Sequence, residues 1–125
     1  MDLKTIICRQ QCKLSSQNLE PQTSKNVKGD KTIDENILDN AAIKASFLAY
    51  KEELKKQGTS AETDHVSGYS KYTPEQVFYI AYGMSMCSAV TKDYLEHLIN
   101  EGDFSPKVFR VNTVLQNDPN FCVNV

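Results

Sequence analysis

The stretch TIDENILDNAAIKASFLAYKEELKKQ, residues 32–57, decides the fold class of this chain. Its apolar side chains recur every three or four residues, which is the spacing of one face of an α-helix. The recurring residues are Ile33, Ile37, Leu38, Ala41, Ala42, Ala45, Leu48 and Ala49. The basic pair Lys55-Lys56 suits a helix C-terminus, and Gly58 is a typical stop. The stretch therefore predicts an amphipathic helix from about Thr32 to Gln57.

A second helix is predicted to begin at the sequence Thr73-Pro74-Glu75-Gln76. Thr73 can cap it, Pro74 fits the first turn, and Gln76 stands at the third position of a capping box. The run from Val77 to Met84 is apolar nearly all round, so this helix is expected to be buried on more than one side.

A third helix is predicted from Thr91 to Asn100, with Gly102 ending it. The side chains expected to face inward are Tyr94, Leu95, Leu98 and Ile99. Residues 13–31 are polar and lack apolar periodicity, so they are expected to form a loop or linker. The tail from Asp103 is expected to be irregular, extended over 108–111, with a last turn after 117–119. The predicted fold class is mainly α.

Length and charge exclude several classes of function. A chain of 125 residues is one domain or a piece of a larger one. A formal charge of −2 argues against nucleic acid as the main partner. No apolar run reaches the roughly 18 residues of a membrane span. Residues 1–14 hold only the short apolar block Ile6-Ile7-Cys8, so no secretory signal is predicted there.

Glu35 and Asp39 are the first candidate functional residues. They are four positions apart, so a helix places one carboxylate above the other, where like charges repel. A cation is therefore expected opposite them: a metal, an Arg or Lys, or a histidine ring. From these residues alone a plainer interpretation is favoured, in which Thr32 and Glu35 form a capping box at the helix start.

Several segments resemble a known family, in the family's order. The sequence Glu35-Asn36-Ile37-Leu38-Asp39-Asn40 resembles the Glu-Asn-Ile-Ala-Asp-Asn signature of the neprilysin and endothelin-converting-enzyme family of zinc metallopeptidases. Residues 47–58, 73–87, 91–95 and 103–112 are similar to segments that follow in that family, and the resemblance covers about residues 27–121. It implies that residues 32–125 form the helical C-terminal part of a gluzincin-type peptidase domain, after an irregular segment over 1–31.

The resemblance also implies roles for individual residues. Glu35 would be a zinc ligand, Asp39 would orient a zinc-bound histidine, and Arg110 would contact the backbone carbonyl of a peptide substrate. An alternative for Arg110 is a structural pair with a carboxylate such as Asp103. The family hydrolyses internal bonds of peptides, and it implies an extracellular or membrane-surface location.

Two departures from the family bear on activity. The His-Glu-x-x-His motif that supplies two zinc ligands and a general base is absent, because the only histidines are His65 and His97. The family's oxyanion-stabilising histidine aligns with Phe104, which has no donor. The chain alone is therefore expected to be inactive, or to need an upstream peptidase segment. The alternative is a non-catalytic helical binding module or pseudo-enzyme derived from the family.

The remaining candidates concern cysteines, one serine and the surface. The four cysteines fit either thiols of a cytosolic protein or disulfides of a secreted one. The resemblance implies that Cys87 pairs with a cysteine outside this chain and that Cys8 and Cys122 could pair. Ser105 has no neighbouring histidine in sequence, so it is not predicted to be a nucleophile. Apolar side chains expected to remain uncovered are Phe78, Tyr82 and Met86.

Overall fold

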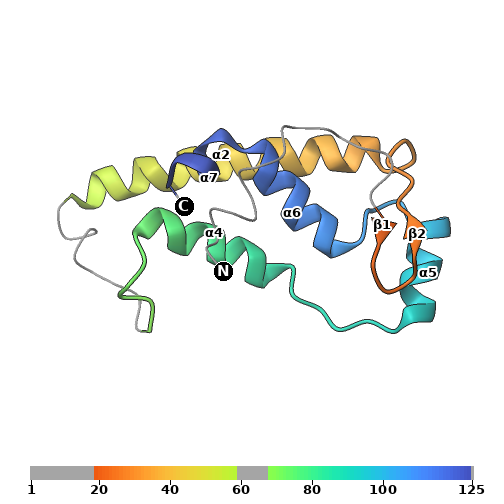
Figure 1. Cartoon of the computed structure of the whole chain (residues 1–125). Helices are drawn as coiled ribbons and strands as arrows, with labels where there is room; N and C mark the ends of the chain where they lie inside the picture. Colours follow the sequence, from red (N-terminus) through yellow and green to blue (C-terminus); the bar gives the residue numbers. More distant parts are fainter. Residues whose placement is uncertain (1–18, 59–67, 125) are drawn as a thin grey trace.

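The computed structural model describes residues 19–58 and 68–124, and they form a mainly α fold, as the sequence predicts (Figure 1). The elements are β1 Leu19–Glu20, β2 Lys25–Asn26, α2 Ile33–Gln57, α4 Pro74–Ser85, α5 Lys92–Glu101, α6 Lys107–Asn117 and α7 Pro119–Asn124. Within these ranges, every helix is too short or too polar to cross a lipid bilayer.

The long helix α2 confirms the prediction made from residues 32–57 and runs along most of the molecule in Figure 1. It ends at Gly58, whose φ of 66° lies in the left-handed region that favours glycine. Its inward face carries Ile43 and Phe47, which are both buried. The capping box predicted at its start is wrong, since the Thr32 side chain makes no capping hydrogen bond.

The helix α4 begins as predicted. The backbone N–H of Gln76 donates to the Thr73 hydroxyl at 3.2 Å, and the Thr73 N–H donates to the Gln76 side chain at 3.1 Å. The prediction that this helix is buried on several sides is met only in part. Tyr79 alone is fully buried within it, Val77, Phe78 and Ile80 are half-buried, and Met84 is 58% exposed.

The helix α5 also lies where the sequence predicts it, but the prediction that Tyr94 faces inward is wrong. Leu95 and Ile99 are buried and Leu98 is half-buried, whereas Tyr94 is 53% exposed. Leu95 and Ile99 are one turn apart and share a face, and Tyr94 is rotated away from that face.

The irregular tail predicted from Asp103 is instead the helix α6, followed by the short helix α7 in place of the expected last turn. Valines at 108 and 111 favour an extended chain in isolation. In the fold, Val111, Val114 and Leu115 follow helical spacing and meet the core, and this burial outweighs the local preference.

The core lies where α2, α4, α6 and α7 meet. Its buried members are Ile43, Phe47, Tyr79, Val114, Leu115 and Phe121. Aromatic rings hold its centre: Tyr79 stacks on Phe47 at 5.2 Å between ring centroids and meets Phe121 edge-on at 4.9 Å. Phe78 and Tyr82 pack against this cluster and are half-buried rather than uncovered as predicted. Met86, which follows α4, is also half-buried.

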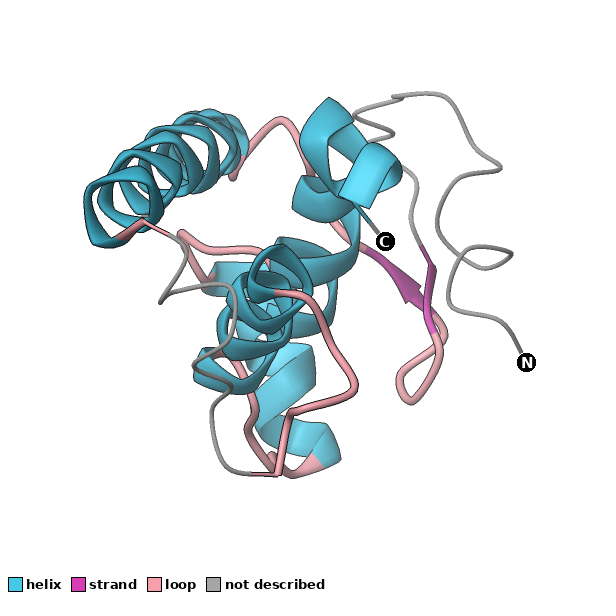
Figure 2. Cartoon of the chain, turned by 90° about the vertical axis from the view of Figure 1, so that its left-hand side faces the viewer, coloured by secondary structure: helices cyan, strands magenta, loops and turns pink. Residues whose placement is uncertain are grey.

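Residues 19–26, expected to belong to a loop or linker, form an antiparallel hairpin in which Leu19 pairs with Asn26 and Glu20 with Lys25. Figure 2 shows this hairpin beside the helices rather than between them. The ammonium of Lys25 lies 2.6 Å from the Glu96 carboxylate on α5, which ties the hairpin to that helix. This ion pair joins residues far apart in sequence, so no local pattern in the sequence predicts it.

Candidate functional site

The fold brings Arg110 of α6 against Asp39 of α2. The Arg110 Nε and Nη2 groups donate to the two Asp39 carboxylate oxygens, each at 2.7 Å. The pair is bidentate, and the two side chains are only 20% and 14% exposed. Arg110 is thus the cation that the spacing of Glu35 and Asp39 predicts opposite these carboxylates. The alternative predicted for Arg110, a pair with a carboxylate, is confirmed, but the partner is Asp39 and not Asp103, the example given.

Two aromatic residues fix Arg110 further. The Tyr82 hydroxyl on α4 donates to the Arg110 backbone carbonyl at 2.9 Å, and the Phe104 ring lies 5.0 Å from the guanidinium carbon. The hydrogen bond that Arg110 donates to Asp39 is the main cause that raises the pKa of Arg110, and the Glu35 charge adds to it. Burial, followed by repulsion from Asp39, raises the pKa of the Tyr82 hydroxyl. The sequence predicts Tyr82 only as an uncovered apolar side chain, because no local pattern links it to Arg110, which is 28 positions away.

Glu35 lies one helical turn before Asp39 and is half-buried. Within the described part of the chain its carboxylate has no hydrogen-bond partner, and its electrostatic influence reaches Arg110. Since the capping box is not formed, the first-turn carboxylate remains available to a ligand. The structure therefore brings the three predicted site residues together on α2 and α6.

The described residues do not by themselves make a complete metal site. No cluster of three or more His, Cys, Asp or Glu side chains suited to a metal ion occurs among them. His97 is exposed on α5, and His65 lies outside the described residues. Zinc needs several converging ligands, so Glu35 alone does not satisfy it.

The cysteine predictions stay largely untested. Cys87 follows α4 and is exposed, while Cys122 on α7 is half-buried. Cys8 lies outside the described residues, and so does its expected pairing with Cys122.

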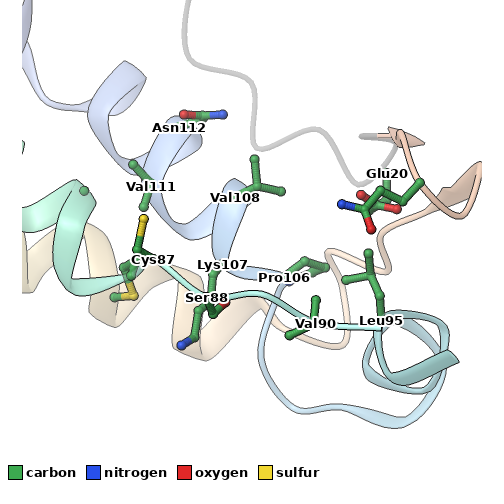
Figure 3. A pocket seen from close by; sticks show the side chains of 13 residues that line it. Glu20, Cys87, Ser88, Val90, Leu95, Pro106, Lys107, Val108, Val111 and Asn112 are labelled. Atoms are coloured by element: carbon green, nitrogen blue, oxygen red, sulfur yellow. The ribbon is translucent and has the colours of Figure 1, made fainter. Parts of the chain in front are cut away.

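A pocket of about 310 Å³ lies on another side of α6 (Figure 3). Most of its lining surface is apolar, and its charged and polar members are Glu20, Gln22, Ser88, Lys107 and Asn112. From α6 it takes Lys107, Val108, Val111 and Asn112, which share one face of the helix, whereas Arg110 belongs to the face that meets α2. The pocket is therefore separate from the Glu35–Asp39–Arg110 group.

Comparison with known proteins adds an independent line of observation. The sequence model of Peptidase family M13 matches residues 2–124. Neprilysin-2 of Drosophila melanogaster is 37% identical over 102 residues, which are 82% of this chain and 13% of the relative. Neprilysin-1 of Caenorhabditis elegans is 37% identical over 79% of this chain and 13% of the relative.

A further relative, Neprilysin-1 of Trittame loki, is 35% identical over 85% of this chain and 15% of its own length. The chain thus spans 13–15% of the length of these curated relatives. No solved structure matches it.

Proposed function

The chain belongs to Peptidase family M13, and we propose that it contributes Glu35, Asp39 and Arg110 to the active site of a neprilysin-like zinc metalloendopeptidase. The observation that carries this proposal is the bidentate Arg110–Asp39 pair, which lies one helical turn from Glu35. Peptides cleaved at internal bonds are the proposed substrates, at an extracellular or membrane-surface location.

Each of the three residues can perform its proposed task as it stands. Glu35 would supply a carboxylate to zinc, which when bound acts as a Lewis acid in peptide hydrolysis. Asp39 uses one acceptor site on each oxygen for Arg110, and each oxygen retains a second that can orient an imidazole. Arg110 spends two of its five N–H donors on Asp39, which leaves donors for a peptide carbonyl.

Activity is proposed to require an upstream peptidase segment, because these 125 residues contain no His-Glu-x-x-His sequence. The outward face of α2 supports this dependence. It exposes apolar side chains opposite the core, including Ile37 at 53%, Leu38 at 60% and Leu48 at 62%. Phe104, which stands over Arg110, offers no hydrogen-bond donor to an oxyanion, so we propose that the chain alone is inactive.

Zinc content tests the proposal directly. The purified chain is dialysed and its zinc measured, alone and after mixing with a segment of a relative that carries His-Glu-x-x-His. We expect no retention by the chain alone, and retention at one zinc per complex in the mixture. Glu35→Gln should abolish that retention, whereas Asp34→Asn, a matched loss of charge one residue earlier, should preserve it. Equal zinc retention by both variants would refute Glu35 as a ligand.

The pocket beside α6 favours a second candidate, a helical binding module without catalysis. Its volume of about 310 Å³ and its apolar lining suit an apolar peptide side chain. The test is calorimetric titration with short apolar peptides, alongside an assay for their cleavage. Binding without cleavage that Val108→Asp removes would support this candidate, and absence of binding would exclude it.

A further inference from the structure

A closed ring of hydrogen bonds joins the start of α2 to the segment that leads into α6. The Ser105 hydroxyl lies 3.0 Å from the Asn36 amide oxygen and 2.9 Å from the Thr32 hydroxyl. The Asn36 amide nitrogen lies 2.9 Å from the same Thr32 hydroxyl. Ser105 and Thr32 are 5% and 4% exposed and Asn36 is half-buried, so water has little access to the two hydroxyl groups.

The donors and acceptors in this ring can be assigned from chemistry. The Asn36 amide oxygen only accepts, so Ser105 donates to it. Ser105 has one proton, so in its contact with Thr32 it accepts and Thr32 donates. The Thr32 hydroxyl also lies 3.4 Å from the Lys28 backbone carbonyl, and its single proton is assigned to Ser105 because that contact is shorter, at 2.9 Å. The Asn36 amide then donates to the Thr32 oxygen. Each side chain donates once and accepts once around the ring, an arrangement in which hydrogen bonds reinforce one another.

This ring fixes the same two elements that the Arg110–Asp39 pair joins. Ser105 precedes the buried Pro106, from whose carbonyl α6 begins with hydrogen bonds to the N–H groups of Phe109 and Arg110 at 2.9 and 3.2 Å. On α2, Asn36 lies one turn before Asp39. The ring therefore fixes where α6 starts relative to α2. The position of the Arg110 guanidinium relative to Asp39 depends on that starting point.

We propose that Ser105, acting through Thr32 and Asn36, is a positioning residue that holds Arg110 in bidentate contact with Asp39. The functional meaning rests on the proposed peptidase role of Arg110, but the structural effect does not. Two parallel N–H···O bonds tolerate little displacement of the groups that form them. A small shift of α6 would therefore break one of the two bonds between Arg110 and Asp39, although the attraction between the two charges would remain. The assigned donor direction also commits the Ser105 proton to Asn36 rather than to a base.

The test measures how strongly Asp39 and Arg110 depend on each other. A double-mutant cycle of Asp39→Asn and Arg110→Met is made in urea unfolding of the 125-residue chain, once with Ser105 and once with Ser105→Ala. The cycle gives a coupling factor, the ratio by which the effect of one substitution on the unfolding constant depends on the other. We expect Ser105→Ala to lower this factor for Asp39 and Arg110 by about threefold or more. Asn36→Ala, which breaks the ring at another member, should have the same effect.

Thr91→Ala is the matched control. Thr91 accepts the N–H of Tyr94 at 3.3 Å at the start of α5, so this variant loses a hydroxyl contact that belongs to neither helix of the pair. It should lower overall stability and leave the coupling unchanged. Coupling that Ser105→Ala leaves equal to that in the control would overturn the positioning role. The cycle needs neither zinc nor activity, so that outcome is distinguishable from failure of the peptidase proposal.

Discussion

The hydroxyl of Tyr79 donates a hydrogen bond at 3.0 Å to the carboxylate of Asp118, a residue with no exposed surface. The other Asp118 oxygen accepts the backbone N–H of Asn120 at 3.0 Å and so caps α7. Burial, and then the bond to Asp118, raises the pKa of the Tyr79 hydroxyl far above its usual range. This one contact therefore ties α4 to α7 through the middle of the core.

Removing that hydroxyl should be costly. Tyr79→Phe leaves a buried carboxylate oxygen without its donor, so we expect the free energy of unfolding to fall by about 1–3 kcal/mol. Urea denaturation measures it. Tyr94→Phe is the control, since Tyr94 is 53% exposed and water can replace its contacts. Equal losses in the two variants would contradict the role given to the Asp118 contact.

The Arg110–Asp39 pair depends on the planar shape of the guanidinium as well as on its charge. Arg110→Lys keeps the positive charge and removes the planar fork that meets both Asp39 oxygens. We expect this change to lower the free energy of unfolding by about 1–2 kcal/mol, measured in urea. Lys107→Arg, on an exposed position of the same helix, should change it by no more than about 0.5 kcal/mol. If Arg110→Lys leaves the free energy of unfolding unchanged, charge alone holds the pair.

Among the elements, those with local end signals could be predicted and those without could not. The Thr73 capping box and Gly58 mark α4 and α2 within a few residues, so short-range chemistry sufficed for them. The helix α6 begins at Lys107, after Pro106, without a capping side chain. It is rich in β-branched residues, so its formation depends on burial against the core. Local patterns cannot report such burial.

The same division runs through the candidate site. Helical spacing places Glu35 and Asp39 on one face, which is a short-range inference that the structure confirms. Arg110 was found through a resemblance, while its partner Asp39 and the supporting Tyr82 are 71 and 28 positions away in sequence. Contacts at such separations follow from packing, and no periodicity in the sequence encodes them.

The tie between α2 and α4 should make stability depend on pH. Lys51 forms an ion pair with Glu75, and the hydrogen bond from Lys51 is the main cause that lowers the pKa of Glu75. A carboxylate with a lowered folded pKa binds fewer protons when folded, so its stabilisation exists above the unfolded pKa of about 4.3 and is lost as pH falls through the folded value.

We therefore expect Lys51→Met to lower the free energy of unfolding by about 1 kcal/mol near pH 7. The difference from the natural chain should shrink toward about pH 3, where Glu75 is protonated in both states. Lys55→Met is the control, because the Lys55–Glu52 pair is 67% and 63% exposed and lies within one helix. A pH-independent difference for Lys51→Met would argue against the ion pair as its cause.

At the scale of the whole molecule, α2 is apolar on two opposite sides. Ile43 and Phe47 face the core, while Ile37, Leu38 and Leu48 are more than half exposed. The exposed alanines at 41, 42, 45 and 49 fill the space between them along the same outward face. Apolar surface of this extent marks an interaction site, and a net charge of −2 offers little repulsion against self-association.

This distribution separates folding from association, and substitution can test the separation. Leu38→Gln combined with Leu48→Gln should change the free energy of unfolding by no more than about 0.5 kcal/mol, because neither leucine contributes to the core. Ile43→Ala, on the inward face at 4% exposure, should lower it by about 2–5 kcal/mol. Urea denaturation of both variants provides the comparison.

The same double variant should reduce self-association. Sedimentation velocity over a range of concentrations is expected to give larger species for the natural chain as concentration rises, and a constant monomer for the variant, because two polar amides interrupt the outward apolar face. Ala45→Ser is a milder change on that face and should reduce self-association to an intermediate degree. A natural chain that stays monomeric at every concentration would mean that this face is not cohesive by itself. Self-association that persists in the double variant would place the contact elsewhere on the surface.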